Sequence, residues 1–142
     1  MMPELIVLLP ARNEEDGIGE VIDRIPIALI SEKGFDTRVV VVDGDSSDST
    51  CAIAESKGAE LIRQNGSIGK GNGVREALKV IFKNPSSDEA ILIMLDADAT
   101  YSPEDIPRFI DSLESCDVVW GSRMRGKMEK NAMSKTNWLG NW

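Results

Sequence analysis

The segment Ala90-Ile91-Leu92-Ile93-Met94-Leu95-Asp96-Ala97-Asp98 joins an uninterrupted apolar run to two closely spaced acids. A continuous apolar run is typical of a strand that is buried on both faces of a parallel sheet. Residues two apart in an extended chain point the same way, so the carboxylates of Asp96 and Asp98 can converge on one cation, and the small Ala97 leaves room. Two carboxylates with water and phosphate oxygens suit Mg²⁺ or Mn²⁺. A solvated turn with helix-capping acids is the alternative, but the position after this strand favours a metal site.

Further short apolar runs recur along the chain, with helical segments between them. Together with Ala90–Leu95 they predict alternating strands and helices, and hence an α/β domain with a mostly parallel, Rossmann-like sheet flanked by helices. Because most of these runs precede Ala90–Leu95, that strand is expected in the middle of the sheet. The other runs are Leu5–Leu9, Val39–Val42, Leu61–Ile62 and Val118–Trp120.

Proline and glycine mark several helix boundaries. Pro26 is expected to break or kink the first helical segment, because proline lacks an N–H and clashes with the preceding turn. Gly58 is expected as a C-cap, since glycine readily adopts the positive φ angle found there. Ser102-Pro103 predicts the N-cap and first position of another helix.

The composition limits the chemistry that this chain can perform. A length of 142 residues, 42% of them hydrophobic and 28% charged, suits one domain with one core. The sequence contains no histidine, so the commonest general base near neutral pH and the commonest transition-metal ligand are absent. Any bound metal would therefore be held by oxygen, which favours Mg²⁺ or Mn²⁺ over zinc.

The charge, cysteines and hydropathy bear on partners and location. A net charge of −8 argues against wrapping nucleic acid, yet residues 123–142 carry five basic side chains and one acidic. Cys51 and Cys116 are far apart, which is typical of reduced thiols in the cytosol. No apolar run approaches the roughly 18 residues of a membrane span, and no signal-peptide cleavage site follows the N-terminus. We expect a soluble, cytoplasmic chain.

Polar residues also follow the first two expected strands, where ligands of open parallel sheets gather. Asp43, directly after the second strand, can accept hydrogen bonds from a base N–H or a ribose hydroxyl, whereas Ser47 or Asp48 is expected to cap the next helix. After the first strand, Pro10 ends the ladder, and Asn13 with its acidic neighbours suits a helix N-terminus. By residue type alone, this last segment is a cap.

The glycine-rich stretch Gly66–Gly73 opens a helical segment. Glycines let the backbone approach an anion, Lys70 and Arg75 supply positive charge, and a helix N-terminus favours phosphate. The stretch is not a P-loop, because Gly71 follows Lys70 where Ser or Thr is required, and it contains no G-x-G-x-x-G fingerprint. A phosphate-binding loop and a flexible turn are both open interpretations.

Taken together, these segments resemble the family 2 glycosyltransferases of the GT-A fold, especially the polyprenyl-phosphate (dolichol-phosphate) mannosyl- and glucosyltransferases. Several motifs in the right order, over nearly the whole chain, are far more specific than any one of them. Gly44-Asp45 departs from the Asp-Gly of many members. The matching segments are Pro10-Ala11 with Asn13-Glu14, Asp43 to Thr50, Gly69-Lys70-Gly71 leading to Val74-Arg75, Asp96-Ala97-Asp98, and Gly121-Ser122-Arg123.

The resemblance implies roles for individual residues. Asp96 and Asp98 would bind Mg²⁺ or Mn²⁺ together with the donor diphosphate, and Asp98 would be catalytic. Arg123, the second catalytic residue, would face an acceptor phosphate. Lys70 would lie near the base or ribose. The implied donor-binding residues are Pro10, Ala11, Glu14 and Asp43, which would contact the nucleoside, and Asp45, Lys70, Asp96, Ala97 and Asp98.

The resemblance further implies inverting transfer of a sugar from a nucleotide-diphosphate donor to a polyprenyl (dolichyl) phosphate or another acceptor. Residues 1–122 would form the nucleotide-sugar-binding GT-A core, and residues 123–142 would begin a truncated acceptor-side segment. Members of the family continue with further acceptor-site elements and often with membrane-associated helices. A longer enzyme would therefore act at the cytoplasmic face of a membrane, and this chain alone would be incomplete.

Two other classes of protein stay open on the sequence. The stretch from Asp96 to Thr100 fits the D-x-D-x-T pattern of haloacid-dehalogenase-like phosphotransferases, with Asp96 as nucleophile, although that pattern normally follows an early strand. The other class is a non-catalytic nucleotide-binding module or an inactive transferase fragment. The basic residues from Arg123 to Lys135 likewise fit either an acceptor-phosphate site or a solvated basic surface.

Overall fold

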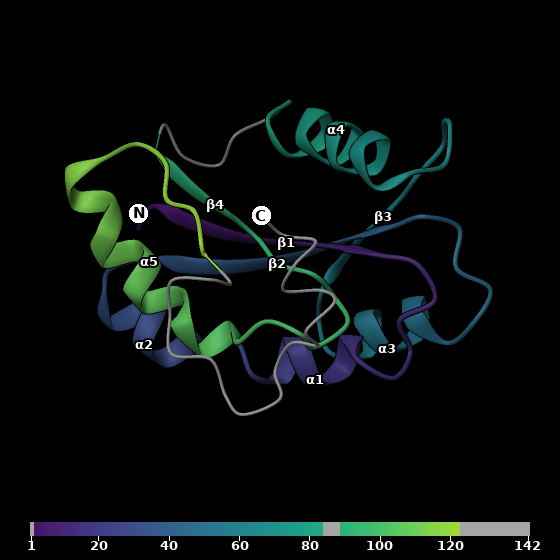
Figure 1. Ribbon diagram of the computed structural model, residues 1–142, viewed down its shortest axis with the longest axis horizontal. Helices are drawn as coiled ribbons and strands as arrows, with labels where there is room; N and C mark the ends of the chain where they lie inside the picture. Colours follow the sequence, from purple (N-terminus) through teal and green to yellow (C-terminus); the bar gives the residue numbers. More distant parts are fainter. Residues whose placement is uncertain (1, 84–88, 123–142) are drawn as a thin grey trace, which may run out of the picture. The chain divides into compact units, whose positions relative to one another are not determined.

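The structure, a computed structural model, describes residues 2–83 and 89–122 (Figure 1). In these ranges one parallel sheet has the strand order β3-β2-β1-β4. β1 is central, since it pairs with β2 on one side and with β4 on the other. The expected α/β architecture is therefore confirmed. The strands are β1 (Glu4–Ala11), β2 (Asp36–Asp43), β3 (Glu60–Arg63) and β4 (Ala90–Met94).

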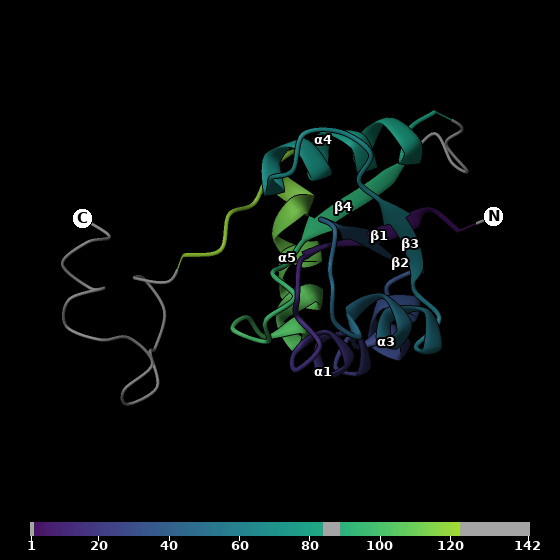
Figure 2. The ribbon, with the colours of Figure 1, turned by 90° about the vertical axis from the view of Figure 1, so that its right-hand side faces the viewer.

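Helices cover the two faces of this sheet unequally (Figure 2). Among the described helices, α4 covers one face and the other four lie on the opposite face. No helix in the described ranges is long and apolar enough to cross a membrane. The helices are α1 (Ile18–Asp23), α2 (Ile27–Glu32), α3 (Thr50–Ser56), α4 (Lys70–Ile81) and α5 (Ile106–Ser112), with 3₁₀ turns at Pro103–Asp105 and Leu113–Ser115.

β1 shows why an uninterrupted apolar run suits the centre of the sheet. Leu5, Val7 and Leu9 belong to the core on the four-helix side. Ile6 and Leu8 point the other way and pack with residues of α4. All five side chains are buried, and burying each one stabilises the fold by roughly 1.5–3 kcal/mol. β1 therefore anchors both layers.

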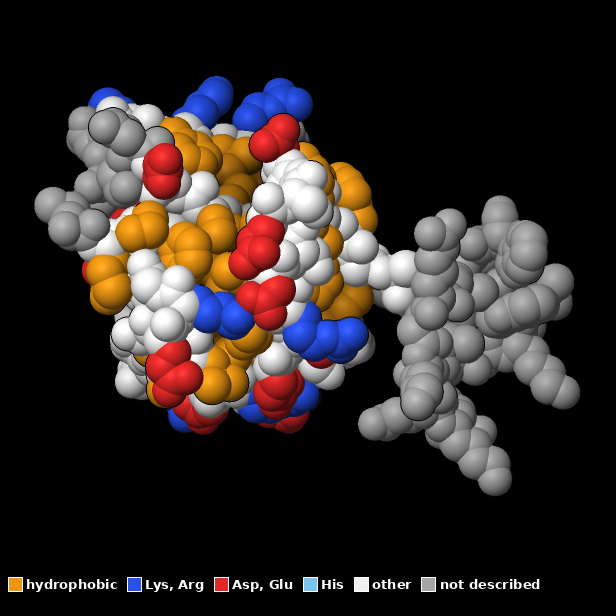
Figure 3. Space-filling view, turned by 90° about the vertical axis from the view of Figure 1, so that its left-hand side faces the viewer, with side chains coloured by type: hydrophobic (Ala, Val, Ile, Leu, Met, Phe, Trp, Pro, Cys, Tyr) orange, Lys and Arg blue, Asp and Glu red, His pale blue; other side chains and the backbone are white. Residues whose placement is uncertain are grey.

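β4 differs from its expected place in the middle of a fully covered sheet. It lies at the edge of the four strands and pairs only with β1 in the described part of the chain. Its exposure alternates, with Ile91 and Ile93 packed against the core while Leu92 is 38% and Met94 50% exposed. This face of β4 is exposed because α4, the helix on that side of the sheet, packs mainly on β1 and β2. Hydrophobic side chains are open to solvent on this side of the molecule (Figure 3).

The expected last strand, Val118–Trp120, is also absent. These residues are described, but they pair with no described strand, and Trp120 is 86% exposed. A strand requires a partner for its backbone hydrogen bonds, and the apolar run alone does not supply one. Residues up to Asp111 form one compact unit, and Ser112 begins another. The proposed acceptor-side segment, residues 123–142, lies outside the described residues, so its boundary stays a prediction.

The helix boundaries agree with the proline and glycine signals. The chain leaves α1 after Asp23 and resumes as α2 directly after Pro26. Gly58 follows α3 with φ +80°, the left-handed conformation that glycine adopts without steric cost. Ser102 occupies the N-cap position before Pro103, although its side chain makes no capping hydrogen bond.

Candidate functional site

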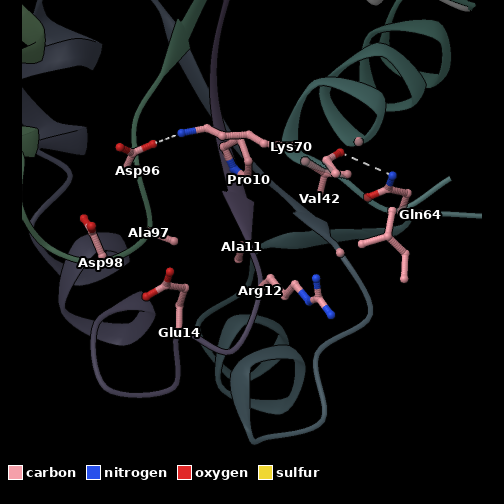
Figure 4. A pocket seen from close by; sticks show the side chains of 14 residues that line it. Pro10, Ala11, Arg12, Glu14, Val42, Gln64, Lys70, Asp96, Ala97 and Asp98 are labelled. Carbon is pink, nitrogen blue, oxygen red and sulfur yellow. Dashed lines mark hydrogen bonds and ion pairs between the residues drawn. The ribbon is translucent and has the colours of Figure 1, made fainter.

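A cavity of about 340 Å³ lies at the carboxyl ends of the strands, beside the start of α4 (Figure 4). The register explains how it forms, because β1 and β2 end side by side at Ala11 and Asp43. The chain leaving β4 runs along β1, with the Leu95 N–H donating to the Leu8 carbonyl at 3.1 Å. Seven of the expected site residues line this cavity: Pro10, Ala11, Glu14, Lys70, Asp96, Ala97 and Asp98.

Three expected site residues do not line it. Asp43 is buried, with 2% of the residue exposed, and its carboxylate accepts a hydrogen bond from the Ser46 N–H at 3.3 Å, within the loop after β2. Asp45 is exposed and has φ +67°. Arg123 lies outside the described residues. Donor contacts by Asp43 and Asp45, and a catalytic role for Arg123, therefore stay predictions.

The sequence did not single out several residues that do line the cavity. Arg12 follows the end of β1, and Gln64 follows β3, so the rule that ligands gather after parallel strands could have found both. The Gln64 side chain donates hydrogen bonds to the carbonyls of Ser67 and Gly69, which fixes the turn before α4. The remaining lining residues are Val42, Gly44, Ile68, Gly69 and Gly73.

The loop after β1 does not cap a helix as expected. α1 begins at Ile18 with Gly17 as its N-cap, and no side chain caps it. Asn13 instead crosses to the loop after β2, where its Oδ1 accepts the Ser47 N–H at 2.8 Å and its N–H donates to the Ser46 hydroxyl at 2.9 Å. The polar partners of Asn13 lie in the loop after β2, at the same end of the sheet. Their distance along the sequence kept this contact from being predicted.

The same two loops are joined again at their next residues. The Glu14 N–H donates to Thr50 Oγ1 at 2.8 Å, and the Glu15 N–H donates to Asp48 Oδ2 at 3.2 Å. Asp48 is not the N-cap of α3, which is Ser49, but its Oδ1 accepts the Thr50 N–H at 3.0 Å and the Thr50 hydroxyl. The hydrogen bond from this hydroxyl lowers the pKa of Asp48. Asp48 thus serves the helix start and the loop junction together.

The acids after β4 are held differently. Lys70, the first residue of α4, forms an ion pair with Asp96. Asp98 Oδ1 accepts the Thr100 N–H at 3.0 Å and the Thr100 hydroxyl at 2.6 Å. Burial opposes ionisation of Asp98, but these hydrogen bonds outweigh it and lower its pKa. Asp98 is therefore a carboxylate at neutral pH.

Glu14 completes a group of negative charges on the same side of the cavity. Burial raises the pKa of Glu14, and the charges of Asp98, Asp48 and Asp96 raise it further, while Lys70 acts in the opposite direction. Clustered carboxylates repel one another unless a cation lies nearby. The site therefore favours a positive ligand on this wall.

The chain's donor atoms fit a hard divalent cation that is shared with a substrate. In the described ranges, no three acidic, cysteine or histidine side chains are placed to hold a metal on their own. Mg²⁺ and similar ions are commonly bound by one or two carboxylates, with water and substrate phosphates completing the shell. Asp96 and Asp98 can supply that partial shell. A phosphate-bearing ligand would have to supply the rest.

Comparison with solved structures defines the class of protein. The fold is similar to glucosyl-3-phosphoglycerate synthase from Mycobacterium tuberculosis, crystallised with Mn²⁺, uridine diphosphate and glucosyl-3-phosphoglycerate. The TM-score is 0.63 at 27% identity, over 81% of this chain and 41% of that one. Mannosyl-3-phosphoglycerate synthase from Rubrobacter xylanophilus gives a TM-score of 0.53 at 30% identity, over 68% and 31%. The chain has the GT-A fold of glycosyltransferases.

The sequence identifies the family within that class. Residues 6–141 match the family described as Glycosyl transferase family 2, and this chain belongs to that family. Its relatives include glycosyltransferase AglJ from Haloferax volcanii, 38% identical over 95% of this chain and 41% of that protein. Dolichol-phosphate mannosyltransferase from Pyrococcus furiosus is 33% identical over 87% and 34%. Family membership removes the support for the phosphotransferase alternative.

Proposed function

We propose that this chain forms the donor-binding part of a metal-dependent, inverting hexosyltransferase that uses a nucleotide-diphosphate sugar and a polyprenyl-phosphate acceptor. One observation carries the proposal: a single cavity brings together the acid pair Asp96 and Asp98, the cation Lys70, and the end of β1 at Pro10-Ala11. The chain spans 41% of AglJ and 34% of the Pyrococcus enzyme, so the activity of a whole enzyme is part of the proposal.

Each wall of the cavity has a distinct task in this proposal. Pro10 and Ala11 place small apolar side chains at the end of β1, which suits contact with a nucleoside. Asp96 and Asp98 would hold Mg²⁺ or Mn²⁺, which supplies positive charge to the diphosphate. Lys70 adds a second positive charge near the same group. Charges placed where the leaving diphosphate gains negative charge favour cleavage of its bond to the sugar.

The reaction would be a single in-line displacement. An acceptor oxygen forms a bond to the anomeric carbon while the bond from that carbon to the diphosphate oxygen breaks, and the nucleoside diphosphate leaves. One displacement inverts the configuration. A phosphate acceptor is already anionic at neutral pH and needs no general base, which is consistent with a chain that contains no histidine.

The acceptor proposal is supported by relatives, and it places the full protein near a membrane. Proteins similar to this chain carry the names dolichol-phosphate mannosyltransferase and dolichyl-phosphate hexose transferase. Dolichyl and other polyprenyl phosphates are lipids, so the enzyme would act at the cytoplasmic face of a membrane. Arg123 would contact the acceptor phosphate in this proposal.

Calorimetry with UDP and GDP, with and without Mn²⁺, tests the donor site. We expect binding that depends on Mn²⁺, because the two carboxylates and the diphosphate complete each other's metal shell. A transfer assay with polyprenyl phosphate or phosphoglyceric acid as acceptor then tests the reaction. Mn²⁺-dependent nucleotide binding without transfer would support the incomplete-enzyme interpretation. If neither nucleotide binds, the donor-site proposal fails.

A further inference from the structure

The ion pair between Lys70 and Asp96 occupies one of the two carboxylates proposed to hold the metal (Figure 4). It joins elements far apart in the sequence, since Lys70 begins α4 and Asp96 follows β4. Of the two basic residues that line the cavity, Lys70 points at Asp96, whereas Arg12 points away from it. Asp96 therefore has a positive partner within the chain itself.

A divalent cation entering this site must compete with that ammonium group. The remaining carboxylates, Asp98 and Glu14, do not form a three-acid metal site with Asp96 in the described part of the chain. A cation arriving alone would meet a pair of ligands, one of them already neutralised. Its affinity would therefore be low, because each hard cation needs several oxygen ligands to replace its water.

A nucleoside diphosphate would change this competition in two ways, by acting on the cation and on Lys70. Its oxygens complete the metal shell, and its negative charge offers Lys70 another partner. The Lys70 side chain is 55% exposed, so it can turn from Asp96 without losing buried contacts.

We infer that Lys70 acts as a built-in counterion that keeps the metal site closed until a nucleoside diphosphate draws its ammonium away from Asp96. Cation and nucleotide then bind cooperatively, and each raises the affinity of the other by the same factor. This inference rests on the proposed donor site. It also moves Lys70 from the base or ribose, where the family resemblance places it, to the diphosphate and the metal.

Mn²⁺ binding followed by electron paramagnetic resonance tests this coupling without any turnover. The protein, its Lys70→Met variant and its Lys70→Arg variant are titrated with Mn²⁺ alone, and then at saturating UDP or GDP with a correction for Mn²⁺ bound by free nucleotide. Lys79→Met is the matched control, because it removes a positive charge from the last turn of the same helix, outside the cavity.

Without nucleotide, Lys70→Met is expected to bind Mn²⁺ on the order of tenfold more tightly than the wild type, since one neighbouring positive charge is gone. Lys70→Arg and Lys79→Met are expected to behave like the wild type. The factor by which nucleotide raises Mn²⁺ affinity should fall in Lys70→Met. Thermal unfolding of each variant verifies that the fold is intact.

The two levels of the proposal fail in different ways. Equal Mn²⁺ affinity of wild type and Lys70→Met without nucleotide overturns the counterion role, while Mn²⁺-dependent nucleotide binding leaves the donor site standing. Tighter Mn²⁺ binding by Lys79→Met to the same degree also overturns it, because the effect would then be one of net charge. No Mn²⁺ binding by the wild type at saturating nucleotide overturns both.

Discussion

Two Asp-x-Thr turns, at Asp48–Thr50 and Asp98–Thr100, follow different strands and have the same local geometry. In each, the threonine N–H donates to the aspartate Oδ1 at 3.0 Å, and the threonine hydroxyl donates to the same oxygen. Their surroundings differ. Thr50 is fully buried and also accepts the Glu14 N–H, whereas Thr100 is exposed. The local sequence specifies the turn, and the neighbouring loop decides its use.

The first turn joins two loops, whereas the second turns its aspartate toward the cavity. The other oxygen of Asp48, Oδ2, accepts the Glu15 N–H, and this bond joins the loops after β1 and β2. Asp98 makes both hydrogen bonds to Thr100 through one oxygen and faces the cavity. The side of the cavity proposed for the nucleoside is therefore preorganised by hydrogen bonds between the loops after β1 and β2. The side proposed for the metal depends on charge, and in this proposal it adjusts when a ligand binds.

Replacing Asp98 with Asn should have the largest effect. Asn keeps the size of the side chain but removes the charge, so Mn²⁺-dependent nucleotide affinity is expected to fall by about 100-fold, the scale seen when metal sites lose important partners. Calorimetry with and without Mn²⁺ measures it. The matched variant Asp48→Asn should keep Mn²⁺ dependence. Unchanged donor affinity in Asp98→Asn would refute the metal assignment.

Thr50→Val and Thr100→Val compare the two turns by stability. Thr50→Val leaves the partly buried Glu14 N–H without its acceptor at the fully buried Thr50 position, so the free energy of unfolding should fall by about 2 kcal/mol. Thr100→Val affects an exposed hydroxyl, and its cost should stay below about 0.5 kcal/mol. Urea denaturation measures both. Equal losses would show that the buried junction contributes nothing beyond the turn itself.

Gly17→Ala tests what positions the second turn. A Cβ at Gly17 would lie 2.8 Å from the Ala97 carbonyl oxygen and 3.0 Å from Asp98 backbone atoms, so the backbone around the acid pair must shift. We expect a loss of roughly 1.5 kcal/mol in unfolding free energy, together with weaker Mn²⁺ binding at saturating nucleotide.

Gly71→Ala is the control for Gly17→Ala. Its Cβ meets nothing within 4 Å, and alanine is the better helix former, so a gain of about 0.5 kcal/mol is expected. A Gly17→Ala protein with normal stability and normal Mn²⁺ binding would mean that this contact does not place the acid pair.

Glu14→Gln should have a small effect, and its size depends on pH. The pKa of Glu14 is raised in the folded state, so its ionisation disfavours folding, and stability is lost as the pH rises through that raised value. Replacing Glu14 with Gln should therefore raise the free energy of unfolding at pH 7 by less than about 1 kcal/mol, and thermal unfolding measures this. The gain should vanish at pH values below the ordinary glutamate pKa of 4.5. A gain that is independent of pH would contradict this account.

The sequence predicted the fold best where both faces of a strand are covered. The apolar run of β1 is buried on both sides, as expected, but the equally apolar run of β4 is half open, because hydropathy does not reveal where α4 packs. Val118–Trp120 failed as a strand for a related reason, since pairing depends on a partner and not on composition. Family resemblance supplied the GT-A fold that periodicity alone left generic.

The site was predictable in its members more than in its connections. The strand-end rule singled out Asp96 and Asp98, and the glycine-rich stretch singled out Lys70, and all three line one cavity, but nothing in the spacing showed that Lys70 pairs with Asp96. Asn13 was interpreted as a cap because its actual partner, Ser47, lies across the sheet edge. Side-chain partners distant in sequence are set by the register of β1 and β2, which residue types do not disclose.

The central position of β1 also constrains how the protein is made. Glu4 aligns with Ala90, so β1 leaves the ribosome well before β4, its partner on one side, has been synthesised. At typical rates of translation, this interval lasts on the order of ten seconds. During that time the apolar residues Leu5 to Leu9 lack β4, one of their two neighbouring strands. We therefore expect chaperones that bind exposed apolar strands to assist the folding of nascent chains.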